Sequence, residues 1–286
     1  MLGLFMTPSS TKSKYNQLIL EQLDKRRVSY ALLTPRDIII DYSDPHPLRD
    51  PVGRPLDLDC VWQRLNTGRW LPLLDIISSL GVPVVNSPHA WRLAMNKALQ
   101  TAVFSTHRIP QPKTYFTYAS PDHLSHCFQH QDTWVLKAPN RDMGKYVFKI
   151  QSLAEVQKVR AVSPQMRQYT YLQSYVDSPG TRQSHIRVNV VDGRATRAGR
   201  LTAPPGEFIT NAARGGSWEI IEGDEELFNL AVRAAAACRL DYAGIDIMEG
   251  PEGYLVIEIN DNQGLGRETA DEVIDYLLRI YPQLRP

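Results

Sequence analysis

The sequence lacks the features that mark several common classes of protein. Its 286 residues include only three cysteines, Cys60, Cys127 and Cys238, which are far apart and form no C-x-x-C pair. This argues against a disulfide framework or a zinc module. No uninterrupted run of about eighteen apolar residues occurs, so we expect no transmembrane helix. The first residues show neither a basic region nor a small-residue cleavage site, so we expect no signal peptide and a cytoplasmic location.

Strong net charge and the commonest catalytic motifs are absent as well. The formal net charge is +1, which gives no general reason to expect a nucleic acid or membrane partner. The patterns G-x-x-x-x-G-K-[ST], G-x-G-x-x-G and G-x-S-x-G do not occur, so P-loop, Rossmann and hydrolase interpretations have no support. The 43% apolar composition is typical of a globular protein. Any phosphate site must therefore be built from locally placed basic residues.

The N-terminal part shows the alternation of an α/β domain. Helical spacing at 14–25 and 71–80 predicts two helices, the second ended by Gly81, and residues 41–55 predict a loop. Apolar runs predict the strands, at 1–6, 28–33, 38–40, 58–63 and 82–85. We therefore predict an α/β domain over residues 1–85 with a mainly parallel sheet.

Residues 86–286 predict a second domain of the α+β class. Ser87 and Pro88 provide an N-cap and a first-turn proline for one helix running toward His107. Turns such as VDGR and EGPEG indicate antiparallel hairpins. The strands are predicted at 114–118, 134–138, 146–150, 170–176, 184–191, 194–201, 243–248 and 254–260. Helices are predicted from about 121, and at 152–161, 224–240 and 269–280.

The strongest chemical signal is GIDIM at 244–248 followed by YLVIEIN at 254–260. Glu258 and Asn260 are two apart in a strand and so project from one face. If the hairpin folds about Pro251, Asp246 lies opposite Val256, with its carboxylate diagonal to Glu258. Carboxylate and amide oxygens suit Mg²⁺ or Mn²⁺ better than zinc. Exposed polar residues of an amphipathic hairpin are the alternative, but three such residues would be costly to bury among Ile, Val and Leu without a partner.

Basic residues supply a second signal. In NAARGG at 211–216, an arginine beside glycines can bring its guanidinium and backbone N–H groups to an anion. A simple turn explains the tripeptide RGG equally well. Arg187 and Arg200 strengthen the signal if their strands are adjacent. Their guanidiniums and that of Arg214 would then face one cleft, and three such charges need an anion between them. Lys97 and Lys137, in apolar surroundings, suit the phosphates of a nucleotide. The segment PNRDMGKYV is then a lid that carries Gly144 and Lys145.

Together these segments resemble the ATP-grasp superfamily, and within it the RimK-type carboxylate–amine ligases, over about residues 86–268. The resemblance implies a two-lobed ATP-grasp domain, with a small lobe at 86–175 and a catalytic lobe at 176–286, preceded by the α/β domain. It implies ATP and two Mg²⁺ or Mn²⁺ ions as cofactors. EINDNQGLG at 258–266 resembles the signature that follows the last strand in that family.

The resemblance also implies roles for individual residues. Arg200, Asn211 and Arg214 would be catalytic, holding the phosphoryl group or the acyl-phosphate, and Asp246, Glu258 and Asn260 would hold the metal. The segment LQSYV at 172–176 would bind adenine through backbone groups. The remaining nucleotide-binding set would be Lys97, Lys137, Gly144, Lys145, Gln173, Ser174, Tyr175, Val176, His185 and Arg187.

Three departures from the family pattern concern the nucleotide. Ser174 stands where the hinge usually has an acidic residue, His185 replaces the carboxylate that usually binds ribose, and Gly144 is alone in a lid that usually has several glycines. We expect an ATP-dependent ligase that adds an amino acid to a small acid, peptide or protein carboxylate, with small-molecule or peptide substrates and a possible homo-oligomer. An ATP-grasp enzyme acting on a non-peptide metabolite and a nucleotide-binding protein with little turnover are the alternatives.

Overall fold

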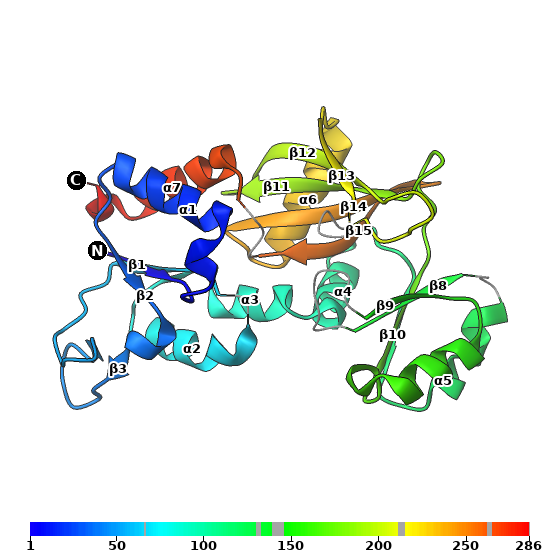
Figure 1. Ribbon diagram of the computed structural model, residues 1–286, viewed down its shortest axis with the longest axis horizontal. Helices are drawn as coiled ribbons and strands as arrows, with labels where there is room; N and C mark the ends of the chain where they lie inside the picture. Colours follow the sequence, from blue (N-terminus) through cyan, green and yellow to red (C-terminus); the bar gives the residue numbers. More distant parts are fainter. Residues whose placement is uncertain (66, 130–132, 139–145, 211–214, 262–264, 286) are drawn as a thin grey trace.

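The computed structural model describes residues 1–65, 67–129, 133–138, 146–210, 215–261 and 265–285. The three larger of the four sheets among the described residues lie in different parts of the molecule, and helices α3 (Pro88–Ala94) and α4 (Lys97–Thr106) run between them (Figure 1). In the part of the chain so described, no helix is long and apolar enough to cross a membrane.

The N-terminal sheet is parallel, as predicted. Its strand order is β2-β1-β5-β6, with β1 at Leu2–Phe5, β2 at Tyr30–Leu33, β5 at Cys60–Gln63 and β6 at Val84–Val85. Helices α1 (Lys14–Lys25) and α2 (Leu71–Ser79) belong to this part, and the predicted end of α2 at Gly81 is confirmed by a φ of 88° there. Part of the predicted loop at 41–55 forms a strand instead, because β4 (Leu48–Arg49) pairs with β3 (Ile39–Ile40).

The C-terminal helix α7 (Arg267–Ile280) packs against the N-terminal sheet. Its Val273, Ile274 and Leu277 lie in one apolar core with Leu2 and Trp62. Figure 1 shows α7 beside α1, where Asp271 accepts a 2.9 Å hydrogen bond from Arg26. Residues before and after the predicted domain boundary at residue 85 therefore share one apolar core.

The small sheet is antiparallel, with strand order β7-β10-β8-β9. Helix α5 (Leu153–Val162) and the 3-10 helix at Pro121–Gln129 pack on one face of it, around Trp134, Leu136 and Leu172. The helix predicted from about residue 121 is therefore a 3-10 helix, which is wound more tightly than an α-helix. The strands are β7 at Thr114–Thr117, β8 at Trp134–Lys137, β9 at Val147–Ile150 and β10 at Thr170–Ser174.

The largest sheet is five-stranded and antiparallel, in the order β13-β12-β11-β14-β15. Helix α6 (Glu225–Ala237) and α4 pack against it in one apolar core that includes Ile186, Ile247 and Val256. The strands are β11 at Ser184–Val191, β12 at Arg194–Thr202, β13 at Ser217–Ile221, β14 at Tyr242–Gly250 and β15 at Gly253–Asn260. The opposite face of this sheet, called the site face below, carries the polar residues of the candidate site.

Candidate active site

A β-bulge places two carboxylates side by side on the site face. Gly250 pairs with Gly253 and Ile247 with Val256, but the register then shifts and Asp246 pairs with Glu258. Ile257 is the extra residue of this bulge. The predicted pairing of Asp246 with Val256 is therefore wrong. The observed ladder starts from Gly250 and Gly253, and without the bulge it would place Asp246 opposite Ile257, with the two carboxylates on opposite faces. Asp246 and Glu258 lie directly opposite, closer than the diagonal arrangement that was predicted.

Glu258 is held by a lysine at the start of a helix. Its Oε1 lies 2.9 Å from Nζ of Lys97. The helix predicted from Ser87 to His107 is wrong as a single element, because the chain is extended at Asn96, whose side chain caps the N–H groups of Ala98 and Leu99. Lys97 therefore stands in the first turn of α4, buried and facing β15.

Asp246 is held by three side chains. Arg187 donates to both of its carboxylate oxygens, at 2.6 and 2.7 Å, and Nδ2 of Asn260 donates to Oδ2 at 3.1 Å. Nε2 of His185 lies 3.5 Å from Oδ1, and only 5% of Asp246 is exposed. Burial alone would raise the pKa of Asp246, but Arg187 and His185 hold this pKa well below its usual value. Asp246 is therefore ionised in the folded protein.

Lys137 joins the cluster from the small sheet. Its Nζ donates a 2.6 Å hydrogen bond to Oε1 of Gln173, and both side chains lie on the face opposite α5. Burial lowers the pKa of Lys137 to about 8, with Glu258 acting against this shift and the charge of Lys97 adding to it. The predicted residues Lys97, Lys137, Gln173, His185, Arg187, Asp246, Glu258 and Asn260 are thus brought together.

Arg200 lies on the other face of the large sheet. Strands β11 and β12 are adjacent, as predicted, but the register shifts between Asn189 and Val190, so Arg200 pairs with the core residue Ile186 while Arg187 pairs with Gly199. Arg200 forms an ion pair with Glu249 and donates to Oγ of Ser184 at 3.3 Å. The prediction that Arg187 and Arg200 face one cleft is wrong, because this bulge turns Arg200 away.

The predicted hinge at 172–176 begins within β10 and continues past its end, but several of its backbone groups have protein partners. The N–H of Ser174 donates to the carbonyl of Lys113 at 2.8 Å, and the N–H of Tyr175 to that of Thr133 at 3.1 Å. The carbonyl of Val176 accepts from Gln183 at 2.8 Å. A nucleotide base would have to use other groups of this segment.

Four predicted residues, Gly144, Lys145, Asn211 and Arg214, lie outside the described residues. The same is true of most of the lid segment and of residues 262–264 in the segment that resembles the family signature. Their predicted roles stay predictions.

Gln100 is a positioning residue that the sequence interpretation missed. Its Oε1 accepts from the N–H of Ile259 at 3.0 Å, and its Nε2 donates to the carbonyls of Ile259 at 3.1 Å and Ala94 at 2.6 Å. Ile259 lies between Glu258 and Asn260, so this amide fixes the strand that carries two proposed ligands. Its spacing of three residues from Lys97, on the same side of a helix, was the available signal.

Replacing Gln100 should destabilise the strand that carries Glu258 and Asn260. We expect Gln100→Ala to lower the free energy of unfolding by roughly 1–3 kcal/mol, because it leaves buried backbone groups without a partner. Urea unfolding followed by circular dichroism measures this, with Gln17→Ala on the exposed part of α1 as the control. Equal unfolding free energies for the two variants would contradict the role assigned to Gln100.

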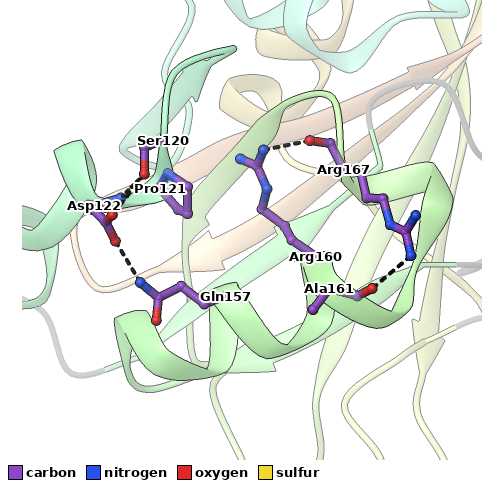
Figure 2. A pocket seen from close by; sticks show the side chains of 7 residues that line it. All are labelled: Ser120, Pro121, Asp122, Gln157, Arg160, Ala161 and Arg167. Carbon is purple, nitrogen blue, oxygen red and sulfur yellow. Dashed lines mark hydrogen bonds between the residues drawn. The ribbon is translucent and has the colours of Figure 1, made fainter.

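A pocket of about 370 Å³ lies away from this cluster (Figure 2). Its polar groups bind one another or the backbone: Gln157 donates to Asp122 at 2.6 Å, Arg160 to the carbonyl of Arg167 at 2.6 Å, and Arg167 to that of Ala161 at 2.9 Å. It lies by α5, on the opposite face of the small sheet from Lys137. It therefore has no place in the chemistry of the cluster.

Comparison with known proteins identifies relatives over most of the chain. The RimK-like ATP-grasp domain model matches residues 94–281. The tetrahydromethanopterin:alpha-L-glutamate ligase of Methanocaldococcus jannaschii is 27% identical over 271 residues, covering 91% of each chain. A probable alpha-L-glutamate ligase of Haemophilus ducreyi is 30% identical over 213 residues, 72% of this chain and 69% of the relative.

Solved structures show the same fold. The ATP-grasp ligase PsnB, in complex with a phosphomimetic variant of its minimal precursor, Mg and ADP, superposes with a TM-score of 0.74 at 17% identity, covering 100% of this chain and 98% of that one. D-cycloserine synthetase DcsG gives a TM-score of 0.75 at 17% identity and covers 99% of both chains. The predicted combination of a parallel sheet with antiparallel sheets is confirmed, and these neighbours share the fold.

Proposed function

Because this chain belongs to the RimK-like ATP-grasp family of carboxylate–amine ligases, we propose that its cluster of acidic and basic residues activates a carboxylate with ATP and joins it to the amine of an amino acid. The enzyme is an ATP-dependent ligase that forms C–N bonds. In the proposed reaction a carboxylate oxygen of the acid attacks the γ-phosphorus of ATP and ADP leaves. The amine then attacks the acyl-phosphate, loses a proton and displaces phosphate, which leaves an amide.

The observation that carries the proposal is how the charges are paired. Lys97 and Arg187 bind the two carboxylates Glu258 and Asp246, so cations and anions neutralise each other in a partly buried site. A nucleotide triphosphate with a divalent metal offers the same charges in exchange. Its phosphates would bind Lys97, Lys137 and Arg187, and its metal would bind the carboxylates that these basic residues release. The site is thus arranged to bind the two together.

The residues present fit a magnesium site. Asp246, Glu258 and Asn260 supply two carboxylates and an amide oxygen on one face of two paired strands, and such hard oxygen donors suit Mg²⁺. We propose that these three residues hold two ions. When bound, the metal would supply positive charge to the phosphoryl oxygens during transfer. Asn260 would have to turn its amide oxygen toward the metal, which exchanges its present hydrogen bond to Asp246.

The protein itself would contribute positioning and charge. Lys97, from helix α4, and Lys137, from strand β8 of the small sheet, would hold the phosphates, and Gln173 would orient Lys137. In our proposal Asn211 and Arg214 stabilise the acyl-phosphate, Gly144 and Lys145 cover the phosphates, and His185 with the segment Ser174–Val176 lines the nucleotide. Arg200 is not part of the catalytic set that we propose, because it lies on the face of the large sheet opposite the site face, where it pairs with Glu249.

The names of the relatives indicate the amine substrate. The matched curated relatives named above are glutamate ligases, and another solved complex of PsnB contains the precursor peptide PsnA2. We therefore propose glutamate as the amine donor and a small acid, a peptide or a protein carboxylate as the acceptor.

The proposal is tested by ADP release with Mg-ATP, glutamate and a panel of acids, with the product identified by mass spectrometry. The expected product has the mass of acid plus glutamate minus water, with one ADP formed for each product. Asp246→Asn and Glu258→Gln should both lose this turnover, whereas Glu252→Gln, in the exposed turn of the same hairpin, should keep it. Nucleotide binding without ADP formation over the whole panel would refute the proposal.

Nucleotide affinity should fall as the pH rises above about 8. Burial lowers the pKa of Lys137 to about 8, so its ammonium loses charge near that pH, while a bound phosphate would raise the pKa again. Binding then takes up a proton, and the affinity falls by up to about tenfold per pH unit above the lower pKa. Calorimetric titration with Mg-ADP in two buffers of different ionisation enthalpy measures both effects. Lys137→Arg keeps its charge and should show a flatter profile; identical profiles would contradict this role.

A further inference from the structure

Two large apolar side chains at the edge of the large sheet point toward the site. In the ladder, Leu201 pairs with His185 on one side and with Trp218 on the other, and Gly199 pairs with Arg187 and with Ile220. Residues directly opposite each other in an antiparallel ladder project from the same face. Trp218 and Ile220 on β13 therefore share the site face with His185 and Arg187. Figure 1 shows β13 beside β12 in this sheet.

The indole of Trp218 rests on the backbone of Gly199. A Cβ atom built on Gly199 would lie 2.1 Å from Cζ2 and 2.3 Å from Cη2 of that ring. No real Cβ tolerates such distances, so any larger residue at position 199 displaces the indole. The ring thus leans inward over β12, toward the strand that carries Arg187.

The side chains of Trp218 and Ile220 remain open to solvent. Trp218 is 45% exposed and Ile220 64% exposed, although both lie on the face that holds the buried charge cluster. Exposed apolar surface of this kind, next to a polar site, is typical of a surface that a ligand covers. Its apolar character sets it apart from the phosphate-binding residues.

We propose that Trp218, seated on Gly199, forms the wall of the subsite for the acid substrate, and that this acid carries a flat apolar or aromatic group that packs against the indole. The inference rests on the proposed ligase function. Gly199 lies two strands from Asp246, so the ring stands about 10 Å from the metal ligands at a strand spacing of about 4.8 Å. Glutamate, with its amine at the reaction centre, is too short to reach it. The group that contacts Trp218 therefore belongs to an acid with a body of about that length.

Two peptide acids serve as probes, Trp-Gly-Gly and Ala-Gly-Gly, which place a ring or a methyl group about 10 Å from the single carboxylate. Calorimetric titration in saturating Mg-ADP measures binding without requiring turnover. The wild-type chain should bind the ring-bearing peptide about tenfold more tightly. Trp218→Ala and Gly199→Ala should lose this preference, and Trp218→Phe should retain most of it.

Tyr118→Ala is the matched control, because Tyr118 is a 72% exposed aromatic residue on the small lobe. It should keep the wild-type preference, and the affinity for Mg-ADP should stay within about twofold in all four variants. Equal binding of the two peptides by the wild type, an unchanged preference in Trp218→Ala, or a ring effect on the amine substrate instead would overturn the inference. Failure of ADP release is a separate result that refutes the ligase reaction, since the binding preference does not depend on turnover.

Discussion

Asp246→Asn should lower the rate of ADP formation by at least about a thousandfold, because it removes charge from the proposed metal site at the point where phosphoryl transfer needs it. Asn keeps the shape of the side chain, so the proposed nucleotide site should persist. The substitution also leaves the partly buried Arg187 without the carboxylate that accepts two hydrogen bonds from it. Loss of one partner of a fully buried pair lowers the free energy of unfolding by about 3–5 kcal/mol, which sets the upper bound expected here. A coupled ADP assay and urea unfolding measure the two effects.

A double substitution separates catalysis from stability. In Arg187→Met with Asp246→Asn, no unpaired charge remains, so most of the lost unfolding free energy should return while ADP formation does not. Wild-type turnover in Asp246→Asn would contradict the metal assignment. Loss of turnover in the single variant followed by recovery in the double variant would show that Asp246 acts only through the fold.

Lys97→Met should change two affinities in opposite directions. Lys97 binds Glu258 at 2.9 Å and is proposed to bind phosphate when the nucleotide enters. Without its charge, affinity for Mg-ADP should fall by roughly ten- to a hundredfold. Affinity for Mn²⁺ alone should rise, because Glu258 no longer has an ammonium partner to exchange. Titration calorimetry with each ligand measures both.

Lys97→Arg provides the comparison, since it keeps the charge and should move both affinities much less. A fall in the affinities for Mn²⁺ and Mg-ADP together would mean that Lys97 only supports the local fold. Unchanged affinities in Lys97→Met would remove this residue from the site.

Strand boundaries and turns were largely predictable from the sequence. The strand at Ser184–Val191 agrees with its prediction at both ends, and the VDGR turn forms a hairpin with φ of 53° at Asp192 and 69° at Gly193. Alternation of apolar residues and a two-residue turn are local signals, so they can be recognised without a structure.

The two bulges were not predictable, and they decide which side chains meet. In a regular ladder from the Gly250 and Gly253 pair, Asp246 would oppose Ile257, and Glu258 would face the core side. A regular ladder from Val191 and Arg194 would place Arg200 opposite His185 on the site face. One extra residue in each strand reverses both outcomes. No local pattern in either strand marks where that residue is inserted.

Two other misses depend on tertiary contacts. Asn96 interrupts a segment with helical spacing, and it caps α4 where Lys97 reaches β15. Strand β13 carries Trp218 and Ile220 exposed at a sheet edge, so its side chains lack the buried face that predicts a strand. Its pairing with β12 becomes visible only in the folded chain.

The most direct test of the central claim is Mn²⁺ binding followed by electron paramagnetic resonance in the presence of a non-hydrolysable ATP analogue. We expect two bound ions per wild-type chain and per Glu252→Gln chain, and loss of this binding in the chain that combines Asp246→Asn with Glu258→Gln. Wild-type Mn²⁺ stoichiometry and affinity in that double variant, with its fold intact, would contradict a metal site built on Asp246 and Glu258.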